Sequence, residues 1–126
     1  DFISIPGMVD FTSSEEYYSS LFHEIVHSTG HSSRLNRPLS TIDKSSYAKE
    51  ELIAEIGSAY LCAMTGIQNK VLDNQAAYID GWLKAIEDDR SLIISAAFKA
   101  KQAVDYLSVG LKFNGIYAAE VDFIIQ

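Results

Sequence analysis

The chain is poor in several features that would each point to a class of protein. Its 126 residues contain one cysteine and two prolines, and 10 Lys and Arg face 17 Asp and Glu. A single cysteine cannot form an intramolecular disulfide, which fits a reducing compartment. The net charge of −7 argues against this chain gripping a phosphate backbone by itself.

Long apolar runs are missing as well. None approaches the roughly 18 residues that a membrane span needs, and the first residues lack the basic-then-apolar pattern of a secretory signal. We therefore expect a cytoplasmic protein with no membrane segment.

What the composition does contain fits one globular domain over residues 1–126, since 48% of the residues are hydrophobic. The alternation in residues 1–5 predicts an edge strand ending at Pro6, and residues 117–126 also have strand character. Because the chain starts abruptly on an apolar segment, we expect it to be the C-terminal part of a longer protein. The predicted fold class is mainly α (α+β), with about four helices and short strands at the termini.

Capping signals and apolar periodicity place the helices. Ser13 with Glu16 three residues later is a capping-box start, and Gly30 is well placed as the C-cap of that helix. A long polar connection follows, and long loops are often functional. Three further helices are expected over about 46–64 (ending at Thr65 and Gly66), from 73 or 74 to about 88, and over about 91–108 (stopped by Gly110).

The pentapeptide HEIVH at positions 23–27 lies inside the first predicted helix. Residues four apart share a helix face, so His23 and His27 can reach one ion at about 2.0–2.1 Å. Glu24 is offset by about 100° and can take the proton of a water molecule that attacks a carbonyl. Spacing and chemistry agree on the H-E-x-x-H motif of zinc peptidases. The alternative is a pair of solvated histidines on an ordinary helix.

A catalytic zinc needs a third protein ligand, and the sequence offers two routes. The longer motif H-E-x-x-H-x-x-G-x-x-H requires a histidine at position 33, where Ser33 stands, and the nearest candidate is His31. The other route uses the next helix, on which Glu51 and Glu55 share a face. Glu51 could bind the metal while Glu55 accepts the remaining N–H of one histidine and fixes its tautomer. A solvated acidic stripe is the alternative for both glutamates.

Several other side chains have two interpretations. Donors to an oxyanion could be His31, Arg34 or Tyr47, in that order. Arg34 and Arg37 could instead bind acidic groups on a partner, or they could equally fasten the loop. Glu50, about 100° from Glu51, is expected to be exposed. The remaining candidates are expected in the core: Cys62, Tyr78, Trp82, Phe98 and Tyr106.

Three segments together resemble the zincin-like metallopeptidase domain of ArdC-type antirestriction proteins, whose relatives occur in polyvalent proteins of plasmids and phages. They are EEYYSSLFHEIVHSTGHSSRLNR, YAKEELIAEIGSAYLCAMTGI and AAYIDGWLKAIEDDRSLIISAAFKAKQAVDYL. The resemblance implies one Zn²⁺, His23 and His27 as ligands, and Glu24 as the base. It also implies a third ligand from the second helix. By similarity to the acidic helix of thermolysin-like peptidases, that ligand is Glu51, and Glu55 orients a histidine.

The expected function is a zinc-dependent metallopeptidase acting on a protein or peptide substrate. DNA binding, if any, would belong to a separate N-terminal domain that this chain does not contain. The alternative is a non-catalytic zinc-containing interaction module that inhibits a restriction enzyme or another partner by binding. DNA mimicry is a weaker version, since the carboxylates are scattered. Glu24 distinguishes the peptidase from the non-catalytic module, because a structural zinc site does not require a general base next to the metal.

Overall fold

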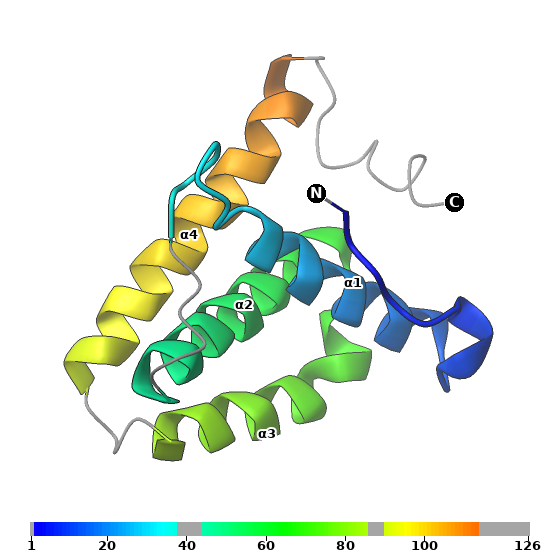
Figure 1. Cartoon of the computed structure of the whole chain (residues 1–126). Coiled ribbons are helices and arrows are strands. Elements are labelled where there is room, and N and C mark those ends of the chain that lie inside the picture. The colour runs from blue at the N-terminus through cyan, green and yellow to red at the C-terminus, as the bar shows by residue number, and fades with distance from the viewer. Residues whose placement is uncertain (1, 38–43, 86–89, 114–126) are drawn as a thin grey trace.

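Four α-helices make up most of the chain in the computed structural model, which describes residues 2–37, 44–85 and 90–113 (Figure 1). The elements in chain order are a short 3-10 turn η1 (Met8–Asp10), α1 (Ser14–Ser28), α2 (Lys44–Thr65), α3 (Gln68–Ala85) and α4 (Arg90–Phe113). The prediction of a mainly helical chain with four helices is confirmed. No described helix combines the length and apolar character that crossing a membrane requires.

The predicted N-terminal strand is wrong. Residues 2–5 are irregular, and the described part of the chain contains no strand. A strand needs a neighbour to satisfy its backbone N–H and C=O groups, and the described elements around this segment are helices. The second predicted strand, at 117–126, lies outside the described residues.

Two helix boundaries also differ from the predictions. α3 begins at Gln68, earlier than position 73, and α4 continues through Gly110 to Phe113. A glycine inside a helix costs only about 1 kcal/mol relative to alanine, so a single glycine need not end a long helix. The predicted end of α2 is confirmed, because Gly66 follows it with a φ of +79° in the left-handed region that suits glycine.

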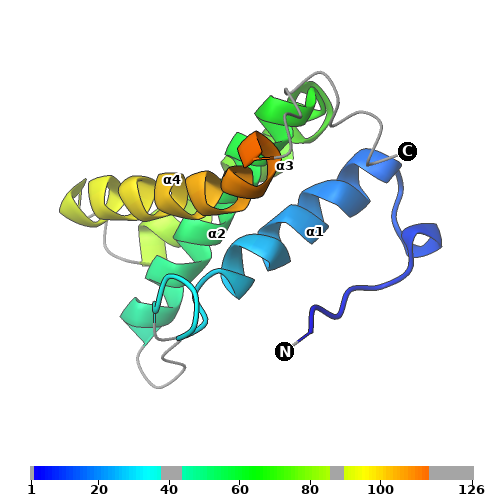
Figure 2. The same ribbon diagram turned by 90° about the horizontal axis from the view of Figure 1, so that it is seen from above.

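α2 is the central element and packs against the other three helices (Figure 1). Seen from above, α1 lies alongside α2 while α4 crosses it (Figure 2). The α2–α4 contact is built from small side chains, because Ala96, Ala100 and Ala103 form a buried stripe on α4 at helical spacing. The rest of the buried core cluster is Val26, Ala48, Leu52, Ile53 and Ala54.

Because alanine and short aliphatic side chains fill this core, most of the aromatic residues lie elsewhere. Tyr78, Phe98 and Tyr106 are 61%, 64% and 44% exposed, so their predicted core positions are wrong. Trp82 does pack against the core. Cys62 is fully buried, which agrees with its predicted role as a small core residue.

The ends of α1 are held by side chains and by the following loop. Ser13 Oγ accepts a hydrogen bond from the Glu16 amide at 3.2 Å, as the capping signal predicts. The Glu16 carboxylate instead accepts a hydrogen bond from the Thr12 hydroxyl. The helix ends at Ser28, and Gly30 is not in a left-handed conformation. A Cβ at Gly30 would lie 3.2 Å from the carbonyl oxygen of Arg37, so this glycine allows the loop to fold back closely.

The contact between α1 and α2 depends on a second glycine. Val26 is the fully buried residue of α1, and a Cβ on Gly57 would lie 2.8 Å and 2.9 Å from its two methyl carbons. The buried Ser58 next to it donates a hydrogen bond to the Ser19 carbonyl at 2.8 Å. Small residues at 57 and 58 therefore let the two helix backbones approach, which positions the site described below.

We expect Gly57→Ala to destabilise the protein by about 1–3 kcal/mol, because the added methyl group overpacks a stiff buried valine. The matched control is Gly81→Ala on α3, where an added Cβ meets nothing within 4 Å. That change should stabilise by about 0.5–1 kcal/mol through helix propensity. Urea unfolding of both variants measures the difference, and equal effects would contradict the close contact.

Candidate metal centre

The antiparallel packing of α1 on α2 brings two histidines and one glutamate together. His23 Nε2 lies 3.0 Å from His27 Nε2 and 3.3 Å from a Glu51 carboxylate oxygen. The other Glu51 oxygen lies 3.5 Å from His27 Nε2. One ligand atom from each of the three residues lies within 4.8 Å of the others. The two histidines and Glu51, which the sequence had singled out, therefore face one point.

The donor set and its spacing fit a tetrahedral divalent cation. Two imidazoles and one carboxylate form a known catalytic zinc ligand set. Zinc bonds of about 2.0–2.1 Å separate tetrahedral ligands by roughly 3.3 Å. The two Nε2 atoms lie 3.0 Å apart, and each lies 3.3 or 3.5 Å from a different oxygen of Glu51, so the spacing is close to that value. With three protein ligands, a fourth position would remain for solvent or substrate.

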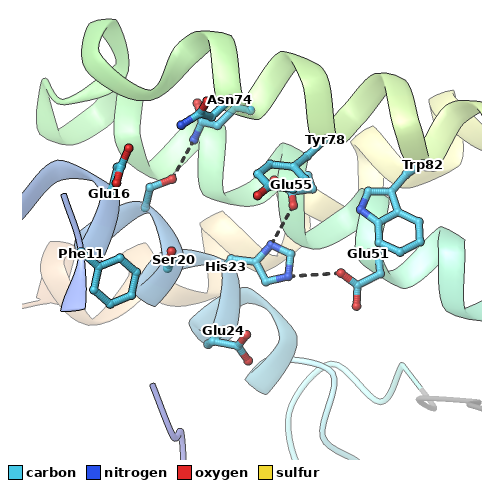
Figure 3. Close-up of a pocket in the computed structure, with 12 residues that line it drawn as sticks. Phe11, Glu16, Ser20, His23, Glu24, Glu51, Glu55, Asn74, Tyr78 and Trp82 are labelled. Carbon is cyan, nitrogen blue, oxygen red and sulfur yellow. Dashed lines mark hydrogen bonds and ion pairs between the residues drawn. The ribbon is translucent and has the colours of Figure 1, made fainter. Parts of the chain in front are cut away.

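Each histidine also has a carboxylate on its opposite ring nitrogen. His23 Nδ1 lies 3.4 Å from Glu55 Oε1, and His27 Nδ1 lies 3.3 Å from Glu50 Oε1 (Figure 3 shows the His23 contacts). A carboxylate at Nδ1 fixes the tautomer that leaves Nε2 with a lone pair for a metal. Both rings are therefore oriented with Nε2 toward the shared point.

Glu50 is the residue of this group that sequence reasoning missed. It is 9% exposed, so its predicted exposed position is wrong. The 100° offset between neighbouring helix positions was correct, but each histidine needs its own carboxylate, and the two rings approach α2 from different directions. The signal in the sequence was the adjacent pair of Glu50 and Glu51 opposite two histidines.

Arg37 holds Glu50 in place from the loop after α1. Its Nε and one terminal nitrogen donate to the two Glu50 oxygens at 3.1 and 2.9 Å. The same guanidinium donates to the Val26 carbonyl at 3.0 Å and to the Thr29 hydroxyl at 2.9 Å. Arg37 thus fastens the loop to the end of α1 and neutralises Glu50, which supports the loop-fastening interpretation of this residue.

The carboxylates create a strong preference for positive charge at the histidines. Burial by itself lowers the pKa of His23, but Glu51 and Glu55 outweigh burial and raise that pKa to about 9. Burial likewise lowers the pKa of His27, and Glu50 and Glu51 raise it to about 9. Burial would raise the pKa of the Glu51 carboxyl, yet the two histidines hold it well below its usual range. A divalent cation would satisfy the same preference on replacing the protons.

Glu24, His23 and Glu51 line a common pocket of about 520 Å³ between α1, α2 and α3. Figure 3 shows Glu24 next to His23 on α1, with Tyr78 and Trp82 facing the cluster from α3. Within the described part of the chain, the Glu24 carboxylate forms no hydrogen bond or ion pair with another residue. It is therefore available to a molecule that enters the pocket.

The three candidate oxyanion donors lie in different surroundings. His31 is exposed and contacts the Ser33 hydroxyl at 2.8 Å, so the structure does not bring it into the ligand group. Arg34 donates to the Ser28 carbonyl at 2.6 Å. Glu51 lies near the Tyr47 hydroxyl and raises the pKa of the tyrosine. Of these three, Tyr47 is the one that interacts with the cluster.

Comparisons with known proteins agree with this arrangement. A family model described as zincin-like metallopeptidase matches residues 1–99. The chain is similar to the crystal structure of antirestriction protein ArdC from plasmid R388, a Mn(II)-bound structure. The similarity has a TM-score of 0.66 and 47% identity, and it covers 82% of this chain and 39% of that one.

Two further relatives are much longer than this chain. DNA primase TraC of Escherichia coli is 40% identical over 108 residues, which are 85% of this chain and 7% of that protein. An uncharacterized protein, y4eC of Sinorhizobium fredii, is 35% identical over 108 residues and is matched over 35% of its length. The chain therefore spans a minor part of each relative.

An H-E-x-x-H helix beside a helix that supplies a glutamate is the ligand pattern of zinc metallopeptidases. The chain belongs to the zincin-like metallopeptidase family, as the resemblance seen in its sequence predicted.

We expect Arg37→Met to destabilise the metal-free protein by about 1–3 kcal/mol, because it removes both guanidinium hydrogen bonds to buried Glu50 and leaves His27 as its remaining cationic partner. The double variant Arg37→Met, Glu50→Met should be less destabilised than the sum of the two single variants, by about 1–3 kcal/mol. Urea unfolding in the presence of a chelator measures these values, and strict additivity would refute the coupling.

Proposed function

We propose that this chain is a zinc-dependent peptidase domain of an antirestriction-type protein. His23, His27 and Glu51 hold Zn²⁺, Glu55 and Glu50 orient the two histidines, and Glu24 is the general base. The proposal is supported by the convergence of two Nε2 atoms and the Glu51 carboxylate at close to tetrahedral spacing, with His23 and Glu51 lining a pocket.

The residues around this centre would have separate roles in peptide hydrolysis. When bound, Zn²⁺ would polarise both the attacking water and the carbonyl of the scissile bond. Glu24 accepts the proton of that water and passes it to the leaving amine. We assign the hydrogen bond to the developing oxyanion to Tyr47, because this residue interacts with Glu51. His31, the first candidate from the sequence, stays a prediction for that role.

The relatives support a metal-binding, antirestriction-type protein as the context of this domain, but they do not identify a substrate. The name of the ArdC structure refers to antirestriction and to Mn(II), so an antirestriction role and metal binding are proposals here. The primase name of TraC describes a protein of which this chain matches 7%, and we propose no primase activity. A protein or peptide substrate follows from the proposed peptidase chemistry. DNA binding, if any, is assigned to a separate domain.

The first test concerns the metal. Glu51→Ala removes one of three ligands and should weaken Zn²⁺ binding most. Glu50→Gln and Glu55→Gln should each weaken it by about 10–100-fold, since they loosen the histidines without touching the ion. Glu15→Gln is the control, because it removes the same charge at a position outside the pocket. Competition with a zinc-sensitive dye gives the affinities, with Mn²⁺ in parallel. Unchanged affinity in Glu51→Ala would refute the ligand assignment.

The second test concerns catalysis. Glu24→Gln should keep its zinc and cleave casein at least about 10²-fold more slowly than the wild type, because the base is lost while the ligands remain. Zinc content and cleavage are measured on the same preparations, with Glu15→Gln as control. If the wild type and Glu24→Gln both hold zinc and neither cleaves casein, the result favours the non-catalytic module that inhibits a partner by binding.

A further inference from the structure

The pocket beside the metal centre is lined by hydrogen-bond acceptors and aromatic rings. Its wall contains the carboxylates of Glu16, Glu24 and Glu55 in addition to Glu51. None of the described residues that line it is a lysine or an arginine. Figure 3 shows Glu16 and Phe11 toward one end of the pocket and Trp82 toward the other.

The charge of this pocket stays negative after a metal is bound. Four glutamates line it, and a divalent cation neutralises two of their charges when both histidines are neutral ligands. Glu50 does not add to the excess, because Arg37 pairs with it. Two negative charges therefore remain in a partly enclosed site, where charge interactions are stronger than in water.

Aromatic rings complete the pocket. Phe11, Tyr78 and Trp82 line it, and Tyr78 is 61% exposed on the side of α3 that faces the cluster. Aromatic faces attract cations and also cover the methylene groups of long basic side chains. An acidic, acceptor-rich wall with an aromatic side matches the chemistry of arginine and lysine, which only donate hydrogen bonds.

We propose that this pocket binds a cationic side chain, arginine or lysine, of the peptide next to the bond to be cut. The inference rests on the proposed function, since it places the peptide at the metal. It adds a substrate class, because a neutral side chain would leave the two excess negative charges of the pocket uncompensated and an acidic side chain would add to them.

Binding can be tested without catalysis. Hydroxamates of N-acetylated arginine, norleucine and glutamate carry one metal-binding group and differ in the side chain. Trp82 is the single tryptophan and lines the pocket, so its fluorescence reports binding to the zinc-loaded protein. We expect the arginine compound to bind at least tenfold more tightly than the norleucine compound, and the glutamate compound to bind most weakly.

Two variants locate the preference. Glu16→Gln, inside the pocket, should reduce the ratio of arginine to norleucine affinity at least threefold, whereas Glu15→Gln, one residue outside it, should leave the ratio unchanged. Equal affinities, or tightest binding of the glutamate compound, would overturn this inference alone. Failure of all three compounds to bind would overturn the metal centre and the inference together. An arginine preference in a protein that cleaves nothing would support the pocket and refute the peptidase.

Discussion

The close packing of α1 on α2 is the contact on which the site depends. Val26 fits against Gly57 with no room for a Cβ, so the two helix backbones lie nearer than ordinary side chains would allow. At that separation an imidazole from α1 reaches a glutamate from α2 directly. The antiparallel direction of the helices then pairs His27 with Glu50 and His23 with Glu55. Glu51 lies between these pairs and reaches both rings.

This arrangement places a dense group of ionisable side chains in a half-buried position, which is costly unless the charges compensate one another. The carboxylate at His27 is itself held. Glu50 receives two hydrogen bonds from Arg37, and the loop that carries Arg37 is folded back against Gly30. The loop after α1 therefore supports the candidate metal centre through Glu50 without entering it. A bound cation would complete the compensation, which couples metal binding to stability.

The same packing leaves α3 to form the other wall of the pocket. Its aromatic residues are free to face the cavity because alanines on α4 and short aliphatic residues on α2 already fill the core. The histidine and glutamate side chains of the pocket therefore come from α1 and α2, and aromatic side chains come from α3. Its acceptors outnumber its donors, and this imbalance is the basis for the cationic side chain proposed as its occupant.

Local signals in the sequence determined the helices and half of the site. The spacing of HEIVH placed His23 and His27 on one face, and the Ser13 cap and the end of α2 at Gly66 followed from short-range chemistry. The pairing of Glu51 and Glu55 with those histidines was anticipated from their spacing, although the choice among Glu51, Glu55 and His31 stayed open. Only the tertiary structure decided that Glu50 is buried against His27, that Arg37 neutralises it, and that Tyr78 faces the pocket. Helix periodicity is a property of neighbours along the chain, whereas these three contacts depend on how closely separate elements approach.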